Sequence, residues 1–245
     1  MPRCYIALGG NVGDVETAFQ TALAGLTADN PVVVTRVSSI CRTRPVGPRS
    51  GGEFLNAAAE IETPLEPLQL LDVLQEFERR AGREAGKIWA PRPLDLDLIF
   101  YADRVIEHPR LTVPHPACWY RRFVLDPLAE IAADVRHPVK GSSVRELQAR
   151  LLARPLRIGL AGSSASERER LRRELTPISD ELRIVDWLPK RNPDPEPAIL
   201  AWLGPGSDSE VPIEFDALPV RPRLDVSQAV DPAVFLRGVV QSALG

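Results

Sequence analysis

The chain has 245 residues, with 30 lysines and arginines, 33 aspartates and glutamates, and a formal net charge of −3. This near balance, without a long basic run, argues against a nucleic-acid partner, and no apolar run is long enough to span a membrane. The first residues lack the apolar region of a signal peptide, and the three cysteines have no metal-binding spacing. We therefore expect a cytoplasmic protein with free thiols and no membrane partner.

The chain begins with a predicted buried strand over residues 4–8 and a turn rich in glycine. Asp14 is expected to cap a helix over 15–28, whose apolar residues recur with helical spacing. The turn between them, Gly9-Gly10-Asn11, has neither the lysine of a phosphate loop nor a GxGxxG pattern. A tight strand-to-helix turn is therefore favoured over a phosphate site.

The next elements give the fold class. Further strands are expected over 32–41, 53–62 and 94–100, with a helix from Pro67, a helix through about 134, and another over 143–152. The leading order, strand-helix-strand-strand-helix-strand, predicts an α+β fold with a ferredoxin-like antiparallel sheet. The turn-rich loop over 42–52 is of the kind that carries function.

The strongest chemical signal lies in residues 89–100. Leucine and aspartate alternate over 94–98, so Asp95 and Asp97 should share one face of a strand while the leucines face a core. Carboxylates at this spacing lie roughly 6–7 Å apart, and Mg²⁺ is usually held by one or two carboxylates together with substrate phosphates. Arg92, between two prolines, suits phosphate oxygens. A half-exposed edge strand with a solvated acidic face is the alternative.

These motifs, with others in residues 5–152, resemble the 6-hydroxymethyl-7,8-dihydropterin pyrophosphokinases of folate biosynthesis. The similar segments, in order, are Tyr5-Ile6-Ala7-Leu8-Gly9-Gly10-Asn11, Arg42-Thr43 with Pro45-Val46-Gly47-Pro48, Phe54-Leu55-Asn56-Ala57-Ala58, Glu78 with Gly82-Arg83, residues 89–97, Leu111-Thr112-Val113-Pro114-His115, and Arg121, Phe123 and Pro127-Leu128. Their joint order and spacing are far more specific than any one of them.

The resemblance implies an ATP-dependent diphosphokinase, which moves pyrophosphate from ATP to the hydroxymethyl group of the pterin and releases AMP. It further implies two Mg²⁺ ions, with ATP and 6-hydroxymethyl-7,8-dihydropterin as ligands. The implied metal ligands are Asp95 and Asp97, and the implied catalytic residues are Arg83, Arg92, His115 and Arg121. The ATP side would comprise Leu71, Gln75, Glu78, Trp89, Ile99, Arg110, Leu111 and Thr112, and the pterin side Thr43, Pro45, Val46, Phe54, Asn56, Asp95 and Phe123.

Several of these residues also have a purely structural interpretation. Phe54 and Phe123 could be ordinary core aromatics, and Arg83 could complement a helix C-terminus. We expect His108 and His137 to be surface loop residues. At the level of function, the alternatives are a nucleotidyltransferase that attacks the α-phosphorus, and a pterin- or nucleotide-binding regulatory module without catalysis.

The family resemblance stops near Arg154, which suggests a pyrophosphokinase domain over 1–153 and a second domain over 155–245. Strands over 156–160, 182–188, 198–203 and 220–226 are expected here, with a helix capped by Ser166 and another over 231–243. This alternation predicts a small α/β extension. Its turn after the first strand lacks a nucleotide fingerprint, so a structural or partner-contacting role is favoured over cofactor binding.

Overall fold

The structure, a computed structural model, describes residues 1–44, 52–82, 92–188, 195–206, 213–220 and 222–245. These residues divide into one unit of residues 1–148 with residue 245, and a second unit of residues 149–244. The elements that begin in the first unit are β1 (Arg3–Gly10), α1 (Val15–Asp29), β2 (Val33–Val37), β3 (Cys41–Thr43), β4 (Phe54–Glu62), α2 (Pro67–Arg80), β5 (Asp95–Tyr101), β6 (Ile106–His108), β7 (Leu111–Val113), a 3-10 helix (Cys118–Tyr120), α3 (Arg122–Ala132) and α4 (Val144–Leu152).

An antiparallel sheet organises the first unit. Its strand order is β2-β4-β1-β5, and β3 pairs with the beginning of β4. The prediction of a mixed α+β fold with an antiparallel sheet is therefore confirmed. The single strand expected over 32–41 is instead two strands, because the hydroxyl of Ser38 accepts the N–H of Ala58 at 2.9 Å and takes the place of a backbone partner.

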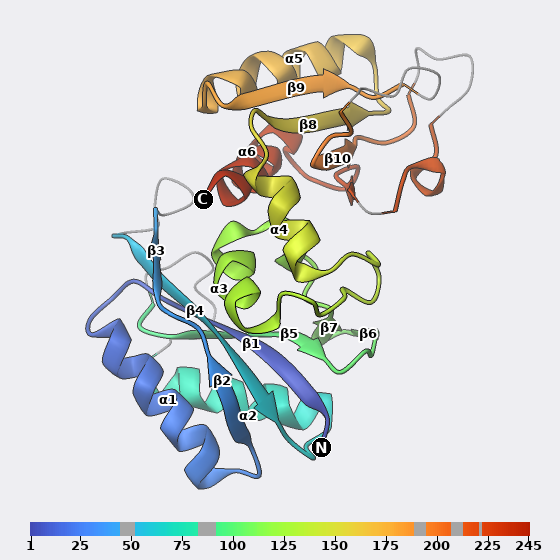
Figure 1. Ribbon diagram of the computed structural model, residues 1–245. Coiled ribbons are helices and arrows are strands. Elements are labelled where there is room, and N and C mark those ends of the chain that lie inside the picture. The colour runs from blue at the N-terminus through green and yellow to red at the C-terminus, as the bar shows by residue number, and fades with distance from the viewer. Residues whose placement is uncertain (45–51, 83–91, 189–194, 207–212, 221) are drawn as a thin grey trace. The chain divides into compact units, whose positions relative to one another are not determined.

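Helices cover both faces of this sheet, with α1 and α2 on one side and α3 on the other (Figure 1). The leucines of residues 94–98 are buried, as their alternation predicts. They belong to a core of side chains from α1 (Val15, Phe19, Ala22, Leu26), α2 (Leu70, Leu74, Phe77), β1 (Cys4, Ile6, Leu8) and β4 (Leu55, Ala57, Ala59, Ile61). Because side chains alternate along a strand, Asp95, Asp97 and Asn56 project from the opposite face.

His137 is buried, so the expectation of a surface position is wrong. Its side chain is 4% exposed, and its ring packs edge-on against Phe100 with centroids 5.6 Å apart. The Nδ1 atom accepts the backbone N–H groups of Val139 and Lys140, both at 3.2 Å. Burial lowers the pKa of His137 from 6.5 to about 4.

This buried histidine should make the fold sensitive to acid. Between pH 6.5 and pH 4 the unfolded chain binds a proton at His137 that the folded chain excludes. The free energy of unfolding therefore does not change through this group above pH 6.5, and it falls as the pH drops from 6.5 towards 4. We expect His137→Asn, which retains an acceptor, to lessen the loss of unfolding free energy between pH 7.5 and pH 5 by about 2 kcal/mol. Urea denaturation at the two pH values measures this, and equal losses in both proteins would contradict it.

The second unit holds a parallel sheet. Its elements are β8 (Leu156–Ala161), α5 (Ala165–Leu175), a 3-10 helix (Thr176–Ile178), β9 (Leu182–Asp186), β10 (Ile199–Trp202), a 3-10 helix (Phe215–Ala217), β11 (Arg223–Asp225) and α6 (Pro232–Leu244). The strand order is β11-β10-β8-β9, and α5 packs against α6.

The cap of α5 differs from the expectation. Ser164, not Ser166, is the N-cap, because its hydroxyl accepts the N–H of Glu167 at 3.1 Å. Among the described helices of both units, none combines the length and apolarity that crossing a membrane requires.

Candidate active site

The two aspartates of β5 lie on the face of the sheet that turns away from α1 and α2. Register pairs Asp95 with Gly9 and Asp97 with Ala7 of β1. Arg92 Nη1 lies 2.6 Å from Asp95 Oδ1, an ion pair in which both side chains are about three-quarters buried. The side chain of Asp97 is 40% exposed. One strand thus presents a shielded and a more open carboxylate on the same face.

His115 faces the second of these carboxylates. Its Nε2 lies 4.0 Å from Asp97 Oδ2, and its Nδ1 accepts the N–H of Ala117 at 3.2 Å. Burial lowers the pKa of His115 below 6.5, opposed by the charge of Asp97 and assisted by that of Arg121. The ring is therefore neutral near pH 7, and because Nδ1 is an acceptor, Nε2 carries the proton. The imidazole can donate a hydrogen bond beside Asp97.

A cavity of about 340 Å³ opens next to Asp97, between α2 and the β6–β7 hairpin. Six of the eight residues predicted for ATP line it: Leu71, Gln75, Glu78, Arg110, Leu111 and Thr112. Asp97 and His115 also line it. Ile99 is buried and does not line it; its carbonyl instead accepts the N–H of His115 at 3.1 Å. Trp89 lies outside the described residues.

Two side chains that line this cavity, Glu78 and Arg110, also make contacts that connect the elements around it. Glu78 is 4% exposed, and its Oε1 accepts the N–H of Leu96 at 2.8 Å, which ties α2 to the edge strand β5. Arg110 forms an ion pair with Asp72 of α2, which ties the β6–β7 hairpin to this helix. Glu78 therefore supports the strand that carries the aspartates.

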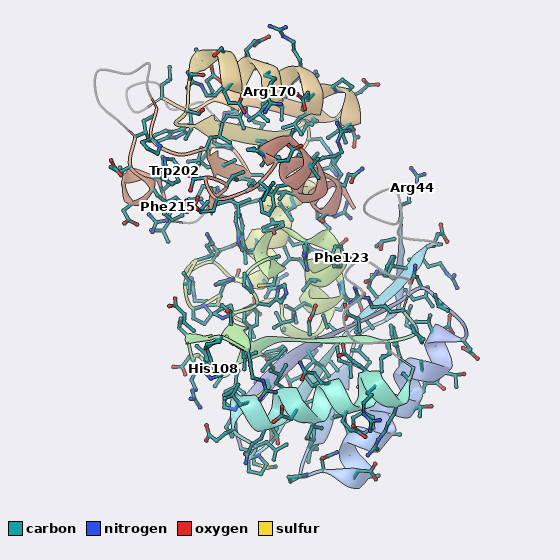
Figure 2. All side chains as sticks on the ribbon, turned by 180° about the vertical axis from the view of Figure 1, so that it is seen from behind. Arg44, His108, Phe123, Arg170, Trp202 and Phe215 are labelled. Carbon is teal, nitrogen blue, oxygen red and sulfur yellow. The ribbon has the colours of Figure 1, made fainter. Side chains whose placement is uncertain are left out.

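The cavity also includes His108, Pro109 and Pro116, which sequence reasoning did not assign to the site. Figure 2 shows His108 on the β6–β7 hairpin, where it pairs with Leu111. Its Nδ1 accepts the N–H of Arg110 at 3.1 Å. The sequence could have placed His108 in the site through a hairpin prediction over 106–113, since a hairpin would pair His108 with Leu111, which was already assigned to the ATP side.

Two of the residues predicted for the pterin, Asn56 and Asp95, lie on either side of Gly9. This glycine pairs with Asn56 on one side and Asp95 on the other, and a Cβ built on it would lie 3.6 Å from Asn56 Oδ1 and 3.8 Å from Asp95 Cβ. Because glycine has no side chain, only backbone separates these two polar side chains on this face of the sheet. The amide of Asn56 donates to Thr43 Oγ1 at 2.9 Å.

The two predicted stacking aromatics have different positions. Phe54 begins β4 and is half-buried, and Phe123 lies in the first turn of α3, also half-buried (Figure 2). The guanidinium of Arg121 lies over the Phe123 ring, 5.5 Å from its centroid. Arg83, Pro45 and Val46 lie outside the described residues.

The donor chemistry around β5 fits Mg²⁺. Among the described residues there is no cluster of three or more potential metal-ligating side chains. Mg²⁺ does not need one, since it is commonly bound by one or two carboxylates with the remaining positions filled by water and substrate phosphates. Asp95 and Asp97 are hard oxygen donors on one face of a rigid strand, so they could hold the ion once a phosphate-bearing ligand is present.

An α+β fold with two strand carboxylates, arginines and an imidazole donor beside a cavity has the features of enzymes that transfer phosphate groups. Residues 5–133 match the family model of 7,8-dihydro-6-hydroxymethylpterin-pyrophosphokinase (HPPK), which is more than half of the chain. The chain therefore belongs to the HPPK family.

Individual relatives support the same family assignment. The chain is 47% identical over 131 residues to the 2-amino-4-hydroxy-6-hydroxymethyldihydropteridine pyrophosphokinase of Bacillus subtilis, covering 54% of this chain and 78% of that protein. It is 44% identical over 142 residues to the enzyme of the same name from Synechocystis sp., covering 58% and 72%. A crystal structure of a Plasmodium falciparum HPPK-DHPS variant with SDX-DHP matches with a TM-score of 0.50 at 13% identity, over 82% of this chain and 64% of that one, a likeness of fold alone.

Proposed function

We propose that this chain transfers the pyrophosphoryl group of ATP to the hydroxymethyl group of 6-hydroxymethyl-7,8-dihydropterin, giving AMP, as a step of folate biosynthesis. The observation that carries the proposal is the HPPK match over residues 5–133, which includes both β5 aspartates. In the reaction the hydroxymethyl oxygen bonds to the β-phosphorus of ATP, and the bond from that phosphorus to the α,β-bridging oxygen breaks. The hydroxyl loses its proton, and AMP leaves.

The cavity next to Asp97 is suited to ATP. Leu71 and Leu111 offer apolar surface, and Gln75 and Thr112 offer hydrogen bonds for the adenosine part. Phosphates directed from there toward β5 would meet the Nε2–H of His115 and the guanidinium of Arg110. Bound between Asp95, Asp97 and the triphosphate, two Mg²⁺ ions would supply positive charge and alignment for the transferred group.

The protein's own cations would complete the neutralisation of phosphate charge. Arg92 is held at Asp95, and Arg121 lies near enough to His115 to affect its pKa. Together with Arg83, which stays a prediction, these two arginines would stabilise the negative charge that develops as the bond between the β-phosphorus and the α,β-bridging oxygen breaks. Phosphoryl transfer needs mainly such positioning and charge stabilisation, with little covalent work by side chains.

We place the pterin beside Gly9, between Asn56 and Asp95. Its flat ring would stack with Phe54 and Phe123, and its amide-like edge would meet the donors and acceptor of Asn56, oriented by Thr43. Asp95, across Gly9 from Asn56, would lie between the pterin and the triphosphate. Pro45 and Val46 stay predictions for the same pocket.

Two finer assignments belong to this proposal. The sheet order is β2-β4-β1-β5, and along the chain a helix follows β1 (α1) and another follows β4 (α2). This arrangement supports a ferredoxin-like classification. We also propose that residues 155–245 form a separate domain with a structural or partner-contacting role. The parallel sheet of this region supports it, as does the end of the family match at residue 133.

The products of a single turnover test the function. With ATP, 6-hydroxymethyl-7,8-dihydropterin and Mg²⁺, we expect AMP and the pterin diphosphate in equal amounts, measured by chromatography. Free pyrophosphate with an adenylylated pterin would instead show attack at the α-phosphorus, the nucleotidyltransferase alternative. Binding of both ligands without any AMP would leave the regulatory module.

A further inference from the structure

The turn Gly9-Gly10-Asn11 meets the segment just before β5, more than eighty residues later in the chain. The backbone N–H of Arg92 donates to Asn11 Oδ1 at 3.0 Å, and the backbone carbonyl of Arg92 accepts the N–H of Asn11, also at 3.0 Å. We call this pair of hydrogen bonds the Asn11 clasp. It engages both polar backbone groups of one residue.

The sequence around Arg92 explains why such a clasp is useful. Pro91 and Pro93 carry no amide hydrogen, so the N–H of Arg92 is the only backbone donor in the Pro-Arg-Pro segment. When both its N–H and its carbonyl are bonded, the Arg92 backbone cannot rotate freely, and the start of its side chain is fixed. The guanidinium then reaches Asp95 Oδ1 at 2.6 Å.

Gly10 makes the close approach possible. A Cβ at this position would lie 2.5 Å from the carbonyl oxygen of Pro93 and 2.8 Å from Val15 Cγ1, distances that side-chain carbons do not tolerate. The turn therefore combines a glycine that admits the Pro93 backbone with an asparagine that binds Arg92. Neither feature is needed merely to connect β1 to α1, which Asp14 already caps through Thr17.

We infer that Asn11 is a positioning residue, which sets the place of the Arg92 guanidinium beside Asp95 for phosphate transfer. The inference rests on the proposed function, because it assigns Asn11 an effect on turnover through Arg92. Asn11→Ala keeps the backbone N–H but removes the Oδ1 acceptor. We expect it to lower kcat about 10- to 100-fold, the scale that small misplacements of catalytic groups cause, with dissociation constants for ATP and pterin changed less than about threefold.

A double-mutant cycle distinguishes positioning from a general structural role. If Asn11 acts through Arg92, Asn11→Ala should cost almost nothing further in an Arg92→Ala background. Asn11→Asp, which retains the acceptor, should recover most of kcat. The matched control is Asp14→Ala, which removes a side-chain-to-backbone bond from the same turn and should leave kcat unchanged. Equal losses of kcat in both backgrounds would overturn the inference.

A measurement without turnover separates this inference from the proposed function. Hydrogen exchange of the Arg92 amide, followed by NMR, should be about tenfold faster in Asn11→Ala than in the wild type and unchanged in Asp14→Ala. If the wild type made no AMP, the proposed function would fail while this result still reported on the clasp. An Arg92 amide that exchanges equally fast in all three proteins would mean that the clasp does not hold the residue.

Discussion

Asp97→Asn is expected to lower kcat about 1,000-fold, a loss typical for a lost charge-stabilising group in an active site. The substitution keeps the size of the side chain and one oxygen, but it removes the negative charge that would hold Mg²⁺ against the triphosphate. The fold should be unaffected, because the side chain of Asp97 is 40% exposed and the neighbouring Leu96 and Leu98 supply the buried contacts of this strand.

The measurement is steady-state AMP formation at saturating ATP, pterin and Mg²⁺, with circular dichroism and thermal unfolding to verify the fold. Asp103→Asn is the matched control, since it removes the charge of an exposed aspartate in the turn that follows the same strand. It should retain wild-type kcat. A folded Asp97→Asn protein with kcat within tenfold of the wild type would refute the assignment of Asp97 as a metal ligand.

Arg92→Ala is expected to lower kcat by about 100- to 1,000-fold through the loss of positive charge at the transferred phosphate. Arg92→Lys should recover only part of this loss, because an ammonium group is a point charge and lacks the planar fork of the guanidinium. The Arg92–Asp95 ion pair adds a second consequence. A divalent ion bound at Asp95 would compete with the guanidinium 2.6 Å away. We therefore expect Arg92→Ala to bind Mn²⁺ more tightly without nucleotide, while turning over more slowly.

Two assays follow these opposite changes, AMP formation for kcat and a Mn²⁺ titration for metal affinity. Arg79→Ala serves as the control, since Arg79 is an exposed arginine of α2 that pairs with Glu76 on the surface. It should change neither quantity. A normal kcat in Arg92→Ala would remove Arg92 from the catalytic set, and weaker Mn²⁺ binding would show that the guanidinium does not compete with the ion.

Local pattern predicted the elements well where one periodicity extends over a whole segment. Helix α1 matches the expected helix over 15–28 within a residue at its C-terminal end, since Asp14 caps it and its apolar residues recur on one face. The predictions were less successful where a side chain interrupts a pattern. Ser38 splits one expected strand into β2 and β3, and Ser164 rather than Ser166 begins α5. Such competition between side chain and backbone depends on geometry that residue type alone does not give.

The sequence by itself determined the chemistry that this protein can offer: two aspartates on one face of a strand whose leucines enter the core, arginine between prolines, and the ordered motifs of one family. Only the tertiary structure decided which of these groups meet. It brought His115 to Asp97, His108 to the cavity wall and Asn11 to Arg92, and it buried His137. The physical reason is that periodicity reports the face on which a side chain lies, whereas contacts between distant segments arise only when the sheet and its helices pack together.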